Sequence, residues 1–289
     1  MTALTRPAVA VVGCGLMGSG IAEVLARAGR TVLVHEVDEA AAERGRVRIE
    51  GSLGRAVRNG KLDEAVRDEV LGRIRIGTDL DALADAELVV EAASEDEAVK
   101  TDLFRRLDAV VVREDAVLAS NTSSIPIMKL GTATRRPEQV VGLHFFNPVP
   151  VLALVEVVPS LLTSPDTVKR VQHLAEDELG KTVIHSQDRA GFIVNALLVP
   201  YLLSGVRMLE SGFASARDID AGMVKGCAHP MGPLQLSDLI GLDTVKAIAE
   251  SLYDEFKEPL FSPPPMLLRM VDAGLLGRKS GRGFYDYSH

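Results

Sequence analysis

The sequence predicts an α/β protein, in which a Rossmann-type N-terminal domain with a mainly parallel sheet is followed by an all-α C-terminal domain. Three observations support this class. Short β-branched runs alternate with helix-period segments in the first part of the chain, a glycine-rich turn follows the first run, and the pattern becomes helical after Gly191. We therefore expect one domain over residues 1–188 and a second, helical domain over residues 189–289.

Five apolar runs are expected to form parallel strands, because strands covered by helices on both faces are apolar throughout. These runs are AVAVVG, TVLVHE, ELVVEAA, AVLASN and VVGLHFF. Helical stretches such as Ile21–Ala28 and Val99–Val111 lie between them. Two further strand candidates, ALVEVV and KTVIHS, flank a helix that should begin at Ser164, with Pro165 in its first turn, and end before Gly180.

The C-terminal domain should contain a long helix over Asn195–Leu209 that is apolar around most of its circumference. A surface shared with a second copy of the chain would explain this pattern, and we expect a homodimer. Burial of the helix between the two domains is the alternative. No strand pattern returns until GFYDY near the C-terminus.

The composition narrows the class of protein. The 289 residues are 47% hydrophobic, as in a folded globular chain, and the net charge of −8 argues against a nucleic-acid partner and a polybasic membrane patch. The N-terminal apolar run is broken by glycines and is too short to span a bilayer. Cys14 and Cys227 lack metal-ligand spacing, so we expect no metal, no disulfide and a reducing, cytoplasmic setting.

The glycine-rich turn GCGLMG lies between the first strand and the first helix, where a dinucleotide pyrophosphate would meet free backbone N–H groups. An acidic residue, Glu36, ends the second strand and should accept hydrogen bonds from the adenosine ribose, which favours NAD over NADP. Arg30 and His35 lie nearby in sequence and could weaken the preference for NAD over NADP, but we expect both residues at the surface. The expected cofactor-binding residues of the turn are Gly13, Gly15, Leu16, Met17 and Gly18.

Polar residues follow two later strands, at the edge of the sheet where ligands bind in this architecture. SNTSS follows one strand and His144 begins HFFNP at the end of the next. Glu156 lies inside the apolar run ALVEVV, where a carboxylate is costly unless a partner pairs with it. His144 is the predicted partner, with Glu156 fixing the tautomer of its ring.

With these residues identified, the chain resembles the L-3-hydroxyacyl-CoA dehydrogenase family, most closely its short-chain 3-hydroxybutyryl-CoA branch. The matching stretches run almost from end to end and include VVEAASEDEAVK, LASNTSSIPI, GLHFFNPVPV, DRAGFIVNALLVPYL, HPMGPLQLSDLIGLD and LGRKSGRGFYDY. The resemblance implies an NAD-dependent oxidoreductase that interconverts (S)-3-hydroxyacyl-CoA and 3-oxoacyl-CoA, with an acyl-CoA as its substrate.

The resemblance also implies catalytic roles. His144 matches the general acid/base, Glu156 its orienting partner, and Ser123 and Asn195 the residues that bind the reacting oxygen. Two structural alternatives stay open: Ser123 could cap a helix before the Ile125-Pro126 segment, which would not exclude catalysis, and Asn195 could cap its own helix.

Further positions match cofactor and coenzyme A contacts. Glu95, Lys100 and Asn147 match residues around the nicotinamide and its ribose. Lys279 matches a residue that the C-terminal domain brings to the cofactor, and solvent exposure is the alternative for it. Ser52 matches a coenzyme A contact. The family often has a lysine where this chain has Asn59, so Arg58 and Lys61 are the candidates to supply that charge. They belong to a segment, Arg44–Lys61, with six basic residues and one acidic residue, which could equally be a solvated helix. The family usually has aspartate where this chain has Glu36.

Two other functions remain as alternatives. The chain could be a related dehydrogenase that acts on another hydroxy acid or on an acyl carrier protein thioester. It could also be a non-catalytic, crystallin-like NAD-binding protein, although the joint presence of Ser123, His144, Glu156 and Asn195 argues against this.

Overall fold

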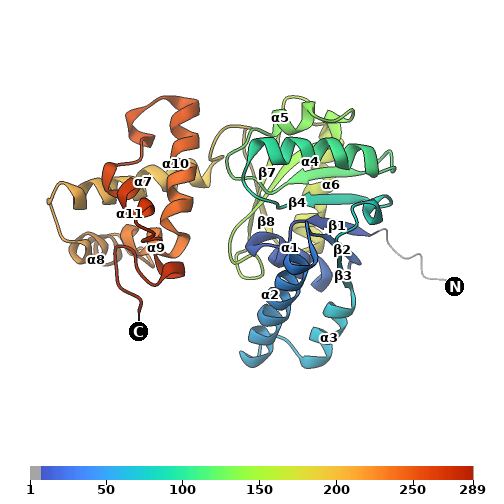
Figure 1. The fold of residues 1–289 in the computed structure, drawn as a ribbon, viewed down its shortest axis with the longest axis horizontal. Coiled ribbons are helices and arrows are strands. Elements are labelled where there is room, and N and C mark those ends of the chain that lie inside the picture. Colours follow the sequence, from blue (N-terminus) through green and yellow to red (C-terminus); the bar gives the residue numbers. More distant parts are fainter. Residues whose placement is uncertain (1–7, 289) are drawn as a thin grey trace. The chain divides into compact units, whose positions relative to one another are not determined.

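The computed structural model describes residues 8–288 (Figure 1). The chain forms two compact units, which meet in the sequence between Asp188 and Arg189. The first is an α/β unit and the second is helical, so the predicted fold class is confirmed. In the described part of the chain, no helix is long and apolar enough to cross a membrane.

One sheet of eight strands, in the order β3-β2-β1-β4-β5-β6-β7-β8, forms the centre of the first unit. Every neighbouring pair is parallel except β6 and β7, which are antiparallel. The order reverses direction between β1 and β4, which is where ligands bind in doubly wound sheets. The strands are β1 Val9–Val12, β2 Val32–His35, β3 Ile74–Gly77, β4 Leu88–Glu91, β5 Val117–Ser120, β6 Val140–Phe145, β7 Leu154–Pro159 and β8 Thr182–His185.

All seven strands predicted in the first unit are present, but the sequence reasoning missed β3. This strand lies at the edge of the sheet beside β2, and its side chains are only partly buried, with Arg75 exposed. An edge strand of this kind does not show the continuous apolar run by which the inner strands were identified.

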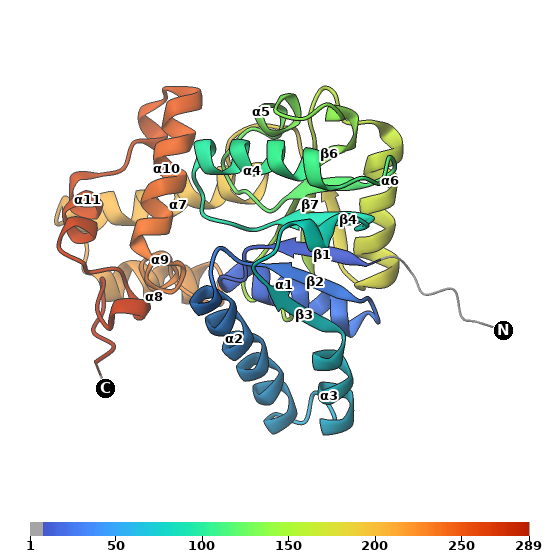
Figure 2. The ribbon, with the colours of Figure 1, turned by 45° about the vertical axis from the view of Figure 1, so that its right-hand side comes forward.

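Helices cover both faces of the sheet. Figures 1 and 2 show α4 and α5 on the opposite side of the sheet from α1. Ile21 of α1 and Val171 of α6 belong to one buried cluster with Val9 and Val11 of β1. The helices of this unit are α1 Leu16–Arg27, α2 Glu39–Arg58, α3 Glu64–Gly72, α4 Glu97–Val110, α5 Ile127–Thr132 and α6 Pro165–His173, with short turns η1 Asp81–Leu83, η2 Pro137–Gln139 and the π-helical η3 Leu174–Glu178.

Side-chain caps fix where several helices begin. Asp38 accepts a hydrogen bond from Ala41 N at the start of α2, and Asp96 caps α4 in the same way. Ser164 accepts from Thr167 N before α6, as its position ahead of a proline predicted.

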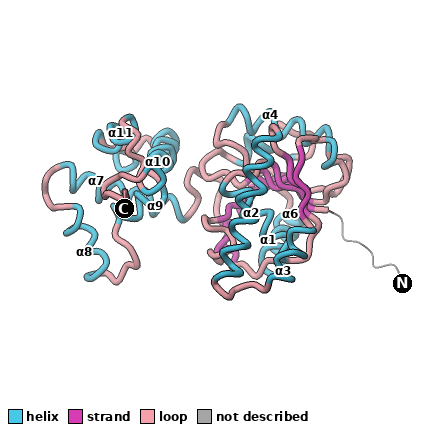
Figure 3. The backbone as a smooth tube through the Cα atoms, turned by 60° about the horizontal axis from the view of Figure 1, so that its bottom comes forward, coloured by secondary structure: helices cyan, strands magenta, loops and turns pink. Residues whose placement is uncertain are grey.

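The described part of the second unit contains helices and loops but no strand (Figure 3). Its core joins Leu202 and Val206 of α7 with Leu234 of α9 and Leu252 of α10. The predicted strand GFYDY forms only an isolated bridge, because the buried Asp238 accepts the backbone N–H groups of this segment. The helices are α7 Val194–Glu210, α8 Ala216–Gly226, α9 Pro233–Ile240, α10 Leu242–Phe256 and α11 Pro265–Asp272, with turns η4 Pro259–Phe261 and η5 Arg278–Ser280.

Candidate active site

The glycine-rich turn connects β1 to α1 at the point where the strand order reverses. Gly13 has a φ of +89°, and a Cβ atom there would lie 2.7 Å from the carbonyl oxygen of Ala92. A Cβ atom on Gly18 would collide with the carbonyl oxygen of Gly13. Only glycine therefore allows α1 to pack this closely on the turn.

The same turn leaves space for a phosphate. A Cβ atom on Gly15 would have no neighbour within 4 Å, and among the described residues no side chain caps the N-terminus of α1. The N–H groups and the positive dipole end of a helix N-terminus attract anions. The residues of the turn therefore fit the pyrophosphate of a dinucleotide.

Glu36 follows β2 directly and lies against this turn. Its Oε1 accepts a hydrogen bond from Cys14 N, and its Oε2 accepts one from Val37 N at 3.1 Å. The carboxylate is thus beside the phosphate-binding turn, where the acidic residue that binds ribose hydroxyls is expected.

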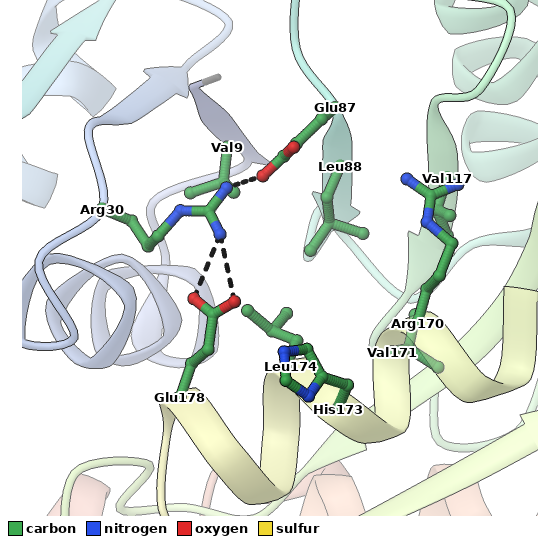
Figure 4. A pocket seen from close by; sticks show the side chains of 10 residues that line it. All are labelled: Val9, Arg30, Glu87, Leu88, Val117, Arg170, Val171, His173, Leu174 and Glu178. Atoms are coloured by element: carbon green, nitrogen blue, oxygen red, sulfur yellow. Dashed lines mark hydrogen bonds and ion pairs between the residues drawn. The ribbon is translucent and has the colours of Figure 1, made fainter. Parts of the chain in front are cut away.

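The prediction that Arg30 lies at the surface is wrong. Arg30 is only 5% exposed and forms ion pairs with Glu87 and Glu178, the latter at 3.0 Å (Figure 4). It precedes β2, whereas Glu36 follows this strand, so Arg30 lies at the opposite end and cannot offset the charge of Glu36. His35 is half-buried, and burial lowers its pKa, with Arg106 adding to the effect.

A cavity of about 300 Å³ surrounds this ion-paired arginine (Figure 4). Its lining includes Val9, Leu88 and Val117, which stand at the amino ends of β1, β4 and β5. Ligands of doubly wound sheets bind at the carboxyl ends of the strands, so this cavity is not the candidate active site.

His144 and Glu156 face each other on the antiparallel strands β6 and β7, as their register shows. The distance between His144 Nδ1 and Glu156 Oε2 is 2.7 Å. His144 is 6% exposed and Glu156 is fully buried. The predicted pairing is confirmed, and it explains how a carboxylate is tolerated within an apolar strand.

Glu95 organises the SNTSS segment after β5. Its Oε1 accepts hydrogen bonds from Thr122 Oγ1 at 2.5 Å, from Ser123 N at 2.8 Å and from Ser124 Oγ at 3.0 Å. Burial raises the pKa of Glu95, but the charge of Lys100 and these hydrogen bonds outweigh it, so the net pKa is below its ordinary value. Glu95 is therefore held as a carboxylate that fixes the backbone at Ser123.

The alternative in which Ser123 caps a helix is wrong. The helix α5 begins only at Ile127, and a different residue, Asp188, binds its first N–H groups. Asp188 accepts from Ile127 N at 2.7 Å and from Met128 N at 2.8 Å. Asp188 is distant in sequence, so local spacing could not reveal it.

A buried ion pair behind this segment was missed by the sequence reasoning. Lys100 Nζ lies 2.5 Å from Glu91 Oε1 and 3.4 Å from Glu95 Oε2, and Glu91 also accepts from Ser120 Oγ at 2.6 Å. Glu91 is fully buried and Lys100 is 1% exposed. The signal was a carboxylate at the end of the apolar run ELVVEAA, the same kind of signal that identified Glu156.

The other predicted residues of the first unit are more exposed. Asn147 follows β6 and is exposed, close in sequence to His144. On α2, Ser52 is half-buried, while Arg58 at the end of the helix and Lys61 beyond it are exposed.

Two predicted residues belong to the second unit. Asn195 is buried inside the first turn of α7, whose N-cap is Ile193, so the alternative in which Asn195 caps this helix is wrong. Lys279 is about half-exposed and forms an ion pair with Asp243 at 2.5 Å.

The strand order, the glycine turn and the acidic residue after β2 define a dinucleotide-binding protein of the doubly wound class. Residues 8–189 match the family model of the 3-hydroxyacyl-CoA dehydrogenase NAD-binding domain, and residues 191–287 match that of the C-terminal domain. The chain belongs to the 3-hydroxyacyl-CoA dehydrogenase family.

Similar proteins agree with this family assignment. A 3-hydroxybutyryl-CoA dehydrogenase of Mycobacterium tuberculosis is 60% identical over 279 residues, which cover 96% of this chain and 98% of that protein. The crystal structure of FadB2 from M. tuberculosis matches with a TM-score of 0.96 at 60% identity, covering 97% of this chain and 98% of the other. That of (S)-3-hydroxybutyryl-CoA dehydrogenase from Ralstonia eutropha matches with a TM-score of 0.91 at 43% identity, covering 98% and 99%.

Proposed function

We propose that this chain is an NAD-dependent dehydrogenase that interconverts (S)-3-hydroxybutyryl-CoA and acetoacetyl-CoA. The observation that carries the proposal is the buried His144–Glu156 pair, which lies beside the carboxyl ends of the parallel strands in a member of this family. The similar proteins named 3-hydroxybutyryl-CoA dehydrogenase support the choice of a four-carbon acyl group.

The activity is tested by following NADH consumption with acetoacetyl-CoA, and NADH formation with (S)-3-hydroxybutyryl-CoA. Turnover of both substrates is expected. Turnover only of another hydroxy acid or of an acyl carrier protein thioester would replace this proposal with a related dehydrogenase, and no turnover at all would favour a non-catalytic NAD-binding protein.

The proposed mechanism assigns the proton to the histidine. Bound NAD would supply the acceptor for the hydride that leaves C3 of the substrate. Nε2 of His144 takes the proton from the 3-hydroxyl group during oxidation and returns it during reduction. Glu156, on Nδ1, fixes the tautomer and balances the charge of the protonated ring. Ser123 and Asn195 are proposed to bind the reacting oxygen, and the hydrogen bonds to Glu95 support a fixed position for the Ser123 backbone.

We propose that the glycine turn binds the pyrophosphate and that Glu36 binds the adenosine ribose. Glu95, Lys100 and Asn147 are proposed to act around the nicotinamide and its ribose, and Lys279 to act from the second unit. The proposal for Lys279 rests on the family resemblance alone.

Replacing Glu36 with alanine should narrow the preference for NADH over NADPH by about tenfold, because the carboxylate repels a 2′-phosphate. The measurement is the ratio of kcat/KM for the two cofactors with acetoacetyl-CoA. An unmodified enzyme that uses NADPH as well as NADH would contradict the role of Glu36.

We propose that the basic end of α2 binds the nucleotide portion of coenzyme A. Replacing Arg58 and Lys61 together with glutamate should raise KM for acetoacetyl-CoA, but not for a pantetheine thioester that lacks the nucleotide phosphates. Added salt should reduce the preference for the full substrate by screening the same charges. An equal effect on both thioesters would assign these residues to a solvated helix.

We propose a homodimer in which α7 lies in the interface. Leu197 is 73% exposed, and Ile193 and Met208 are exposed at spacings that place them on the same side of this helix. Phe213, just beyond the helix, is 79% exposed. Exposed apolar side chains gathered in this way are typical of an interface between protein chains.

Light scattering at micromolar concentration should therefore give twice the mass of the chain, and Leu197→Asp should shift the equilibrium toward the monomer. Leu161→Asp is the control, because Leu161 is 93% exposed in the first unit. A monomeric unmodified protein, or an equal effect of both substitutions, would contradict this interface.

A further inference from the structure

The first half of α2 lies directly against the glycine turn. A Cβ atom on Gly45 would be 2.6 Å from Cys14 Cβ and Sγ, so the helix approaches the turn as closely as glycine allows. Arg48 follows within the next turn of the helix, and its Nη1 donates a hydrogen bond to the carbonyl oxygen of Cys14 at 3.3 Å. Cys14 N donates to Glu36. A guanidinium and a carboxylate therefore flank one residue of the nucleotide-binding turn.

The two side chains act with opposite signs on this residue. Burial raises the pKa of the Cys14 thiol to about 12, Glu36 adds to the rise, and Arg48 and, to a smaller extent, Arg46 oppose it. The neighbouring Arg46 is paired at 3.4 Å with Glu43 on the outer surface of the helix. Arg48 is thus the basic side chain of α2 that hydrogen-bonds to the turn.

We propose that Arg48 is a second determinant of nucleotide choice, placed to bind a phosphate on the adenosine 2′-oxygen, and that Glu36 overrides it in the native chain. In this class of fold an acidic side chain near the end of the second strand selects a ribose 2′-hydroxyl, whereas a nearby arginine accommodates a 2′-phosphate. A guanidinium is well suited to this role because its planar N–H groups match the oxygens of a phosphate. The inference deepens the proposed NAD-binding function and rests on it.

The geometry gives a definite order of effects. With Glu36 present, a 2′-phosphate would have to enter beside a carboxylate, and the cation cannot offset this repulsion. Once the carboxylate is removed, Arg48 is left as the charged side chain that hydrogen-bonds to the turn. Most of the gain in affinity for a 2′-phosphate in Glu36→Ala should therefore depend on Arg48.

The test measures binding of two mononucleotides to the full chain by titration calorimetry. The probes are 5′-AMP and 2′,5′-ADP, which differ only in the 2′-phosphate. Glu36→Ala should bind 2′,5′-ADP about tenfold more tightly than the unmodified protein, and Glu36→Ala with Arg48→Ala should lose most of this gain. Binding of 5′-AMP should change less than about twofold with Arg48→Ala, since this probe lacks the phosphate in question.

The matched control is Glu36→Ala combined with Arg55→Ala, which removes the same charge two turns farther along α2. It should retain the gain for 2′,5′-ADP. The proposal is overturned if the gain survives the loss of Arg48, if Arg55 matters as much, or if Arg48→Ala weakens both probes equally. This experiment measures nucleotide binding and does not depend on turnover. Lack of turnover with acetoacetyl-CoA would therefore reject the proposed activity but would not by itself reject the role of Arg48.

Discussion

The variant His144→Ala should reduce acetoacetyl-CoA about 100-fold to 10,000-fold more slowly than the unmodified enzyme, the range typical for loss of a positioned acid or base. The ring is held at 2.7 Å from Glu156 by facing positions on β6 and β7, so its position is fixed relative to that carboxylate. The measurement is kcat at saturating NADH and thioester. Unchanged turnover would remove His144 from the mechanism.

Two controls separate chemistry from folding. NADH binding to His144→Ala should be nearly unchanged, and it can be followed by the fluorescence of the bound nucleotide. Glu156→Gln should keep the fold and lower turnover less than His144→Ala, since an amide can orient the ring without balancing its charge.

Oxidation of the hydroxyacyl substrate should slow on acidification, because a protonated ring cannot accept the hydroxyl proton, while reduction should tolerate lower pH.

The variant Lys100→Met should lower the free energy of unfolding of the first unit by about 3–5 kcal/mol, the usual cost of leaving one member of a buried ion pair uncompensated. Its partner Glu91 is fully buried and would lose the ammonium at 2.5 Å. The measurement is urea denaturation followed by circular dichroism.

The matched control is Lys129→Met, which removes the same side chain from an ion pair with Glu97 in which both partners are about half exposed. It should change stability little, because exposed ion pairs contribute little. Lys100→Met with Glu91→Gln should be less destabilising than Lys100→Met alone. Equal stability of the two single lysine variants would show that the buried pair contributes no more to stability than the exposed pair.

The parts of the fold that bury apolar surface could be predicted from the sequence. The inner strands are apolar on both faces, so each appears in the sequence as a continuous apolar run. A buried carboxylate needs a partner, which predicted that Glu156 pairs with His144. The antiparallel register of β6 and β7 places these two residues opposite each other. The edge strand β3 has no such run and was missed.

The errors concern contacts between residues far apart in sequence. Arg30 resembles a surface residue until Glu87 and Glu178 are brought to it by other strands and helices. In the same way, the cap of α5 comes from Asp188, 61 residues away. Residue spacing along the chain does not reveal partners that are distant in sequence, so these contacts can be identified only from the tertiary structure.

The uninterrupted helix α2 fixes the distance between the two sites that are proposed to bind nucleotides. Arg48 contacts the cofactor turn, and Arg58, ten residues later in the same helix, is proposed to meet coenzyme A. At a rise of 1.5 Å per residue, the helix sets these two guanidinium-bearing positions about 15 Å apart along its axis, which is nearly three turns. One residue inserted between them would rotate Arg58 by about 100° about the helix axis while leaving the packing of Gly45 on Cys14 in place, so the proposed coenzyme A contact would be lost and the cofactor turn would be unchanged.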